Sequence, residues 1–128
     1  MMFDISIIGD RARVNGEMPI GLANALADIV KERLRQDAKW GEQNHPDGTG
    51  PERSWGLDDP GSAREIAEVF REETDHKARE GKLTWRDIAL EEIAEAFAED
   101  DPELLRAELN QVSAVFAAWA EAITRRVS

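Results

Sequence analysis

The chain has 128 residues, no Cys, and a formal net charge of −11, because 27 Asp and Glu outnumber 16 Lys and Arg. This length is typical of one domain, and the lack of Cys excludes disulfides, thiolate metal sites and Cys nucleophiles. The acidic charge argues against polymeric nucleic acid and membranes as partners, and with no membrane span or signal peptide apparent we expect a cytoplasmic protein.

The N-terminal segment has the composition of a short β appendage. Residues 3–8 are β-prone and are followed by Gly9-Asp10, which predicts a strand. The next few residues lead to the turn pair Asn15-Gly16, so residues 1–18 are predicted to form a hairpin, or one strand and a loop. An isolated two-stranded ribbon is marginal in water, so we expect it to pack on the helices or on a partner subunit.

A first helix and a long loop follow this appendage. Apolar residues recur at helical spacing from Pro19, which predicts a helix to about Ala38. The segment from Lys39 to Gly61 is rich in Gly and Pro, so we predict a loop there. A connection of this length is functional or disordered in most compact domains, and the two Trp within it favour an ordered loop.

Three further helices are predicted from the residues that begin them. The pairs typical of helix N-termini are Ser62 with Glu65, Thr84 with Asp87, and Asp101 with Pro102. Gly81 ends the second helix, and the third runs through Glu99. Only Asp100 and Asp101 separate the third helix from the fourth, so these two are predicted to be antiparallel neighbours. The sequence therefore predicts an all-α fold, with one helical domain over residues 19–128.

Two pairs of oxygen-bearing side chains lie on the third and fourth helices. Glu92 and Glu95 have i, i+3 spacing, and so do Glu108 and Gln111, so the members of each pair share a helix face. Because the two helices are predicted to form a tight antiparallel hairpin, both pairs can meet at a similar height. Three carboxylates and an amide oxygen would then converge.

Such a convergence indicates a cation site. Carboxylates that share a partly buried position need either raised pKa values or a cation. Ligands that are all oxygen select Mg²⁺, with Mn²⁺ as the alternative, and the natural chemistry of that ion is metal-assisted attack of water on phosphorus. The alternative interpretation is that acidic helices carry such pairs by chance, on a solvated surface.

The spacing Glu92-x2-Glu95-x12-Glu108-x2-Gln111 resembles the E-x2-E…E-x2-D pattern of the MazG-like all-α nucleoside triphosphate pyrophosphohydrolases. The upstream segment RQDAKWGEQNHPDGTG is similar to one in short members from actinobacteria and their phages, so the resemblance covers about Glu32 to Arg126. It implies a four-helix MazG-like bundle that hydrolyses a (d)NTP to the monophosphate and pyrophosphate with Mg²⁺. Glu92, Glu95 and Glu108 would be the catalytic and metal-binding residues, with Gln111 as a further metal ligand. The resemblance also implies a homodimer or homotetramer with its active sites near subunit contacts.

One position departs from that pattern. The last acid of the family is Asp, whereas this chain has Gln111, whose amide oxygen can bind a cation but brings no charge. Either Glu91, Glu99 or Asp75 supplies the missing charge, or the protein binds nucleotides with little turnover. Glu91 points about 100° away from Glu92 around the helix, so we expect it on the surface.

The loop after the first helix supplies candidate substrate-binding residues. Trp40 can stack on a base, Asn44 or Gln43 can bind a base edge, Lys39 can bind phosphate, and His45 is a candidate general base. The alternative is a structural loop in which Trp40 caps the helical core and Asn44 makes turn hydrogen bonds.

The basic residues around the second and third helices also allow two interpretations. They either help to neutralise a triphosphate or pair with nearby Glu at i, i+4. These residues are Arg64, Arg71, Lys77, Arg79, Lys82 and Arg86.

Two faces of the third helix are apolar. Leu90, Ile93 and Phe97 line the side opposite the one that carries Trp85 and Glu95, which favours a dimer. The alternative to an enzyme is a non-catalytic helical module that keeps the fold for nucleotide binding or oligomerisation.

Overall fold

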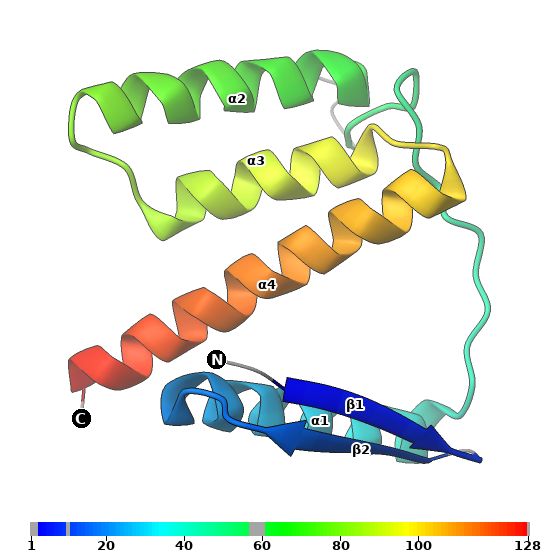
Figure 1. Cartoon of the computed structure of the whole chain (residues 1–128). Coiled ribbons are helices and arrows are strands. Elements are labelled where there is room, and N and C mark those ends of the chain that lie inside the picture. Colours follow the sequence, from blue (N-terminus) through cyan, green and yellow to red (C-terminus); the bar gives the residue numbers. More distant parts are fainter. Residues whose placement is uncertain (1–2, 10, 57–60, 128) are drawn as a thin grey trace. The chain divides into compact units, whose positions relative to one another are not determined.

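The structure, a computed structural model, describes residues 3–9, 11–56 and 61–127. Its elements are the strands β1 (Phe3–Ile8) and β2 (Arg11–Gly16) and the helices α1 (Ile20–Trp40), α2 (Ala63–Arg79), α3 (Trp85–Phe97) and α4 (Pro102–Val127) (Figure 1). The described part of the chain is mainly helical, which agrees with the predicted all-α class. None of its helices is both long enough and apolar enough to cross a membrane.

The chain divides into two compact units. One contains residues 1–42 and 120–128, and the other contains residues 43–119, so α4 contributes to both. The single helical domain expected over residues 19–128 stays a prediction.

The first unit contains the hairpin. The six residues of β1 pair antiparallel with the six residues of β2 along their whole length, which confirms the predicted hairpin. The turn predicted at Asn15-Gly16 is wrong, because both residues belong to β2 and pair across the ladder. The strands are instead connected after Ile8, where Gly9 adopts a φ of +65° that favours glycine. Asp10, the other residue of this connection, lies outside the described residues.

Helix α1 begins after Pro19, as predicted, and ends two residues later than expected. Lys39 and Trp40 are helical rather than part of the loop. Gly41 ends the helix with a φ of +69°, and its N–H donates to the Asp37 carbonyl at 2.8 Å. A positive φ of this kind favours glycine over residues that carry a side chain.

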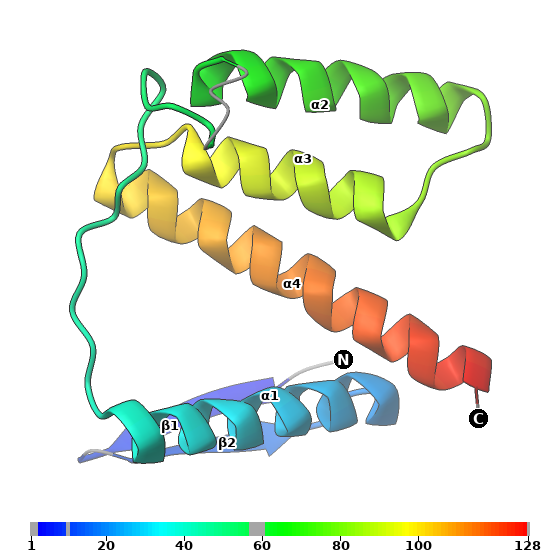
Figure 2. The same cartoon turned by 180° about the vertical axis from the view of Figure 1, so that it is seen from behind.

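In the second unit, α2 and α3 lie side by side, as Figures 1 and 2 both show. The side chains buried on these two helices are mainly alanines, which let helix backbones approach closely. They are Ala63 and Ala67 on α2, and Ala89, Ala94 and Ala96 on α3. A charged contact also joins the helices, because Lys77 Nζ donates to Asp87 Oδ1 at 2.8 Å.

The N-termini of the last three helices are capped as predicted. Ser62 Oγ accepts the Glu65 N–H at 3.3 Å, and Thr84 with Asp87 forms a reciprocal capping box. Asp101 Oδ1 accepts the N–H of Glu103 at 2.9 Å, immediately after Pro102. These caps set where each helix begins. On α3 and α4 they therefore also set where along the helix the candidate ligands lie.

The described part of the loop before α2 contacts α2 and the end of α3, in agreement with the prediction that its Trp stacks on other residues. The Trp55 ring lies 5.5 Å from the Phe97 ring and 5.8 Å from the Phe70 ring, between centroids. Thr49 Oγ1 donates to the Glu99 carbonyl at 2.6 Å, and the Gly50 N–H donates to the Phe97 carbonyl at 3.0 Å. Residues 57–60 of the predicted loop lie outside the described residues.

Candidate metal centre

Three carboxylates come together where α3 meets the start of α4. Glu92 and Glu95 of α3 and Glu108 of α4 each offer one oxygen, and these oxygens all lie within 4.8 Å of one another. All three residues are half-buried. The two pairs of oxygen-bearing side chains singled out in the sequence thus contribute three converging carboxylates, which we call the acid cluster.

The local structure explains why these side chains meet. Glu92 and Glu95 lie one turn apart near the C-terminal end of α3, and the cap at Thr84 fixes where that helix begins. Only residues 98–101 separate the end of α3 from Pro102, the first residue of α4. Glu108 follows within the second turn of α4, so the chain returns it to the end of α3 that carries the other two acids.

The pKa values of Glu92 and Glu108 in this cluster are both raised. Burial, followed by the charges of Glu95, Glu108 and Glu91, raises the pKa of Glu92 above its ordinary value. Burial and then the charges of Glu95 and Glu99 raise the pKa of Glu108. Both shifts have the direction expected for carboxylates that lose water and face like charges.

Two oxygens of the cluster also lack the hydrogen bonds that buried acceptors normally make. No donor among the described residues reaches the buried atoms Glu92 Oε2 and Glu108 Oε2. An unpaired buried oxygen costs free energy, and the cost is larger when the group is charged. Converging carboxylate oxygens that lack donors fit a hard divalent cation such as Mg²⁺ or Mn²⁺.

Gln111 differs from the three acids in being exposed. It follows Glu108 by one helical turn. Of the acids expected to replace its missing charge, Glu99 lies near enough to raise the pKa of Glu108.

Glu91 is half-buried, so its predicted surface position is wrong. Burial, then the charges of Glu95 and Asp75, raise the pKa of Glu91, while a hydrogen bond with Thr74 and the charge of Arg71 lower it. Because Thr74 lies on α2, its hydrogen bond with Glu91 joins two distant segments of the chain, which helical spacing alone does not reveal.

A groove of about 360 Å³ opens beside the acid cluster. Its lining contains the guanidinium groups of Arg64 and Arg71 from α2, and it includes Glu95 and Glu108 of the cluster. Arg71 Nη2 lies 3.5 Å from Glu95 Oε1, and Arg64 Nη1 lies 2.6 Å from Glu52 Oε1. Among the described residues, Lys77 makes the predicted i, i+4 pair, with its Nζ 3.6 Å from Glu73 Oε1, whereas neither arginine does. Sequence analysis missed the Arg71–Glu95 pair, because 24 positions separate the two residues.

The four candidate substrate-binding residues divide between the two units. Lys39 and Trp40 end α1 in the first unit, where Lys39 Nζ lies 4.8 Å from the centroid of the Trp40 ring. Trp40 is 61% exposed, and the expectation that it caps the helical core stays a prediction. Asn44 and His45 belong to the second unit, where His45 Nε2 lies 3.1 Å from Gln43 Oε1.

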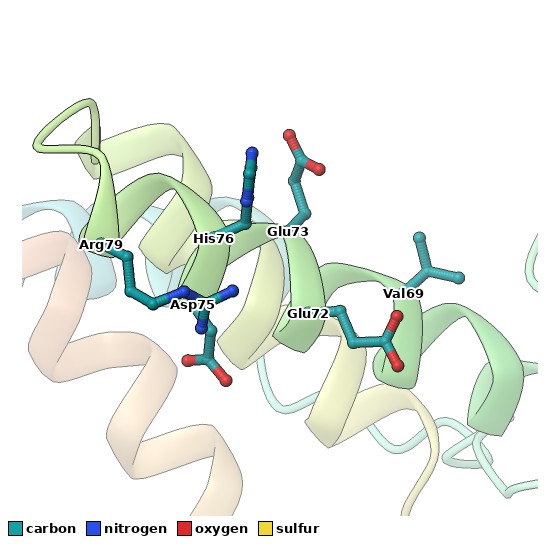
Figure 3. A pocket seen from close by; sticks show the side chains of 6 residues that line it. All are labelled: Val69, Glu72, Glu73, Asp75, His76 and Arg79. Carbon is teal, nitrogen blue, oxygen red and sulfur yellow. The ribbon is translucent and has the colours of Figure 1, made fainter.

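A second hollow, of about 490 Å³, lies along α2 and has a weaker claim to function. All of its lining residues come from this one helix: Val69, Glu72, Glu73, Asp75, His76 and Arg79. Figure 3 shows His76 and Glu73 pointing away from Asp75, so these groups do not converge. His76 is exposed, as predicted, and its Nε2 lies 3.3 Å from Glu80 Oε1. The hollow is larger than the groove, but the groove alone adjoins the acid cluster.

Comparison of the sequence with models of known protein families, with curated proteins and with solved structures finds no match. The residues of the acid cluster and their geometry therefore carry the functional proposal.

Proposed function

We propose that this protein is a MazG-like nucleoside triphosphate pyrophosphohydrolase that uses Mg²⁺ to hydrolyse a (d)NTP to the monophosphate and pyrophosphate. The observation that supports this proposal most directly is the acid cluster, with its converging oxygens and two buried acceptors that no described donor reaches. The pattern of Glu92, Glu95, Glu108 and Gln111, which resembles that family, supplies the substrate class.

Each part of the proposed site has a chemical role. Glu92, Glu95 and Glu108 would hold Mg²⁺ or Mn²⁺, and such an ion supplies positive charge to the phosphate oxygens and lowers the pKa of a bound water. A carboxylate oxygen of the cluster that is not engaged by the cation accepts the proton of the attacking water. The water oxygen bonds to phosphorus as the anhydride bond between the α- and β-phosphates breaks, and pyrophosphate leaves.

The remaining contacts with the nucleotide are proposed from the sequence. Lys39 and Trp40 would bind phosphate and base from the end of α1, and Asn44 and His45 from the loop that follows. We also propose that the protein is a homodimer or homotetramer. The exposed apolar residues of α1 support self-association, because a surface of that kind is stabilised when it is covered.

The alternative is a non-catalytic helical module that binds nucleotides or oligomerises with little turnover. The observation that favours it is Gln111, which is exposed and uncharged where the family has its last acid. A Gln111→Asp variant tests this alternative. If the missing charge limits the cation site, Gln111→Asp binds Mn²⁺ more tightly than the wild type and turns over faster.

The test of the main proposal measures cation binding and catalysis separately. Calorimetric titration with Mn²⁺ and Mg²⁺ should reveal binding that Glu92→Gln and Glu108→Gln each weaken at least tenfold, a loss of about 1.4 kcal/mol. Glu103→Gln, an exposed change on α4, is the matched control and should bind like the wild type. A screen for pyrophosphate release across the common (d)NTPs then identifies the substrate. Cation binding without pyrophosphate release would favour the non-catalytic module, and the absence of cation binding would overturn both the cation site and the enzyme.

A further inference from the structure

One basic side chain reaches the acid cluster from another helix. Arg71 of α2 places Nη2 3.5 Å from Oε1 of Glu95 on α3. The Arg71 side chain is 54% exposed, whereas that of Glu95 is only 23% exposed. The half-exposed guanidinium group therefore pairs with one of the three acids that would hold a cation.

The groove beside the cluster has an unbalanced set of charges. Two guanidinium groups, those of Arg64 and Arg71, face a larger set of carboxylates in its lining. The carboxylates belong to Glu68, Glu95, Glu99 and Glu108. With all four ionised, the groove has an excess of two negative charges and repels phosphate. A divalent cation in the cluster offsets that excess, so an anion can enter only with the cation or after it.

Arg64 and Arg71 differ in their ion-pair partners. Arg64 is paired outside the acid cluster, with Glu52 of the preceding loop at 2.6 Å. Arg71 is paired with a residue of the acid cluster itself. When Glu95 coordinates a cation, its charge is shared with that cation and its attraction for the guanidinium group falls. A half-exposed arginine can then turn to a phosphate oxygen, for which its planar donors are well suited.

We propose that Arg71 is a phosphate-binding residue that exchanges partners. Its guanidinium group pairs with Glu95 in the cation-free protein and binds a phosphate oxygen of a cation-bound diphosphate or triphosphate in the groove. This assignment rests on the proposed function and adds the residue that couples cation binding to phosphate binding. Arg71 thereby also neutralises Glu95 while the cation is absent.

The experiment compares Mn²⁺ alone with Mn²⁺-pyrophosphate as calorimetric probes of the full chain. Arg71→Gln should bind Mn²⁺ alone as tightly as the wild type or several-fold more tightly, because a competing cation has left Glu95. The same variant should bind Mn²⁺-pyrophosphate about tenfold more weakly, a loss of about 1.4 kcal/mol. Arg71→Lys, which keeps the charge without the planar fork, should fall between the wild type and Arg71→Gln.

The matched control is Arg106→Gln, which removes the same charge from an exposed residue of α4 that pairs with Glu103. It should bind both probes like the wild type, and far-ultraviolet circular dichroism checks that all variants are folded. Equal Mn²⁺-pyrophosphate affinity in the wild type and Arg71→Gln, including no binding by either, would overturn the role of Arg71 while leaving the cation site intact. A wild type that binds no Mn²⁺ would overturn the proposed function, and the role of Arg71 with it.

Discussion

At Glu92 and Glu108, the fold carries an electrostatic cost that a cation would remove. Burial and neighbouring carboxylates raise the pKa of both groups above 4.5, the ordinary value. One buried oxygen of each residue, which no donor in the described part of the chain reaches, adds to the cost of ionising it. Carboxylates with perturbed pKa values are common at functional sites, because elsewhere they only destabilise the folded state.

The raised pKa values predict how the stability of the metal-free protein depends on pH. As pH rises from about 4.5, the unfolded chain ionises Glu92 and Glu108 before the folded chain does, so the folded state holds more protons and its stability falls. The loss is complete once the pH exceeds the folded pKa values. We expect the urea midpoint, measured with a chelator present, to fall across this window.

Glu92→Gln should flatten that pH dependence and raise the urea midpoint at neutral pH, because the variant carries no charge to bury. Asp87 has the opposite effect on the pH dependence of stability, and only at lower pH. Hydrogen bonds from Lys77 and then Thr84 lower the pKa of Asp87 to about 2. Its stabilisation is therefore present above 3.8, its ordinary pKa, and is lost as pH falls from there toward 2. Identical pH profiles for the wild type and Glu92→Gln would contradict the prediction.

At the scale of the elements, the cap of α3 connects the core to the acid cluster. Thr84 accepts the N–H of Asp87, and Asp87 in turn accepts from Thr84 and from Lys77 of α2. The same few atoms therefore begin α3 and join it to α2. Because Glu92 and Glu95 follow on that helix, this network also sets where they lie.

Replacing the capping hydroxyl should weaken this network measurably. Thr84→Ala leaves the first turn of α3 without its side-chain acceptor, and we expect the free energy of unfolding in urea to fall by about 1 kcal/mol. Thr84→Ser keeps the hydroxyl and serves as the control, with a loss well below that of Thr84→Ala. Equal losses in the two variants would mean that the methyl group of Thr84, rather than its hydroxyl, stabilises this end of α3.

Local signals predicted the helices well because capping is local chemistry. Ser62, Thr84 and Asp101 each accept backbone N–H groups only two or three residues away, so the sequence around them contains the relevant atoms. The prediction of a turn at Asn15-Gly16 was wrong because these residue types favour turns. Whether they instead join a strand depends on pairing with β1, which is distant in the sequence from the local signal.

The site shows the same contrast. The i, i+3 spacing and the short connection between α3 and α4 were enough to predict that Glu92, Glu95 and Glu108 converge. The half-burial of Glu91 and the approach of Arg71 depend on how α2 packs on α3, which no local pattern encodes. Features that join distant segments are therefore the ones that sequence reasoning missed.

At the scale of the whole molecule, large apolar side chains are poorly covered. Among the described residues, no large side chain is fully buried, and the buried class consists mainly of alanines. All 21 residues of α1 are described, and none of them is buried. Each Å² of apolar surface removed from water contributes about 25 cal/mol of free energy. An assembly that covers this surface is therefore stabilised.

Helix α1 should therefore be a contact between copies of the chain in the proposed oligomer. Ile29, Val30 and Leu34 lie at i, i+1 and i+5 on this helix and are 42%, 55% and 63% exposed. We expect sedimentation equilibrium to give a wild-type mass of twice or four times the 14.3 kDa chain. The double variant Val30→Glu/Leu34→Glu places charges on this surface and should shift the mass to that of a single chain.

Val69→Glu is the matched control, since Val69 is 57% exposed on α2, outside α1. It should keep the wild-type mass. Circular dichroism separates dissociation from unfolding, and Leu34→Gln offers a milder change if the double variant loses helix. Because a dimer dissociates on dilution while a folded monomer does not change mass, the wild type should also lose mass toward the single chain across a dilution series. A wild-type mass of one chain at every concentration would contradict self-association, and the apolar residues of α1 would then have to be covered within the chain or by a different protein.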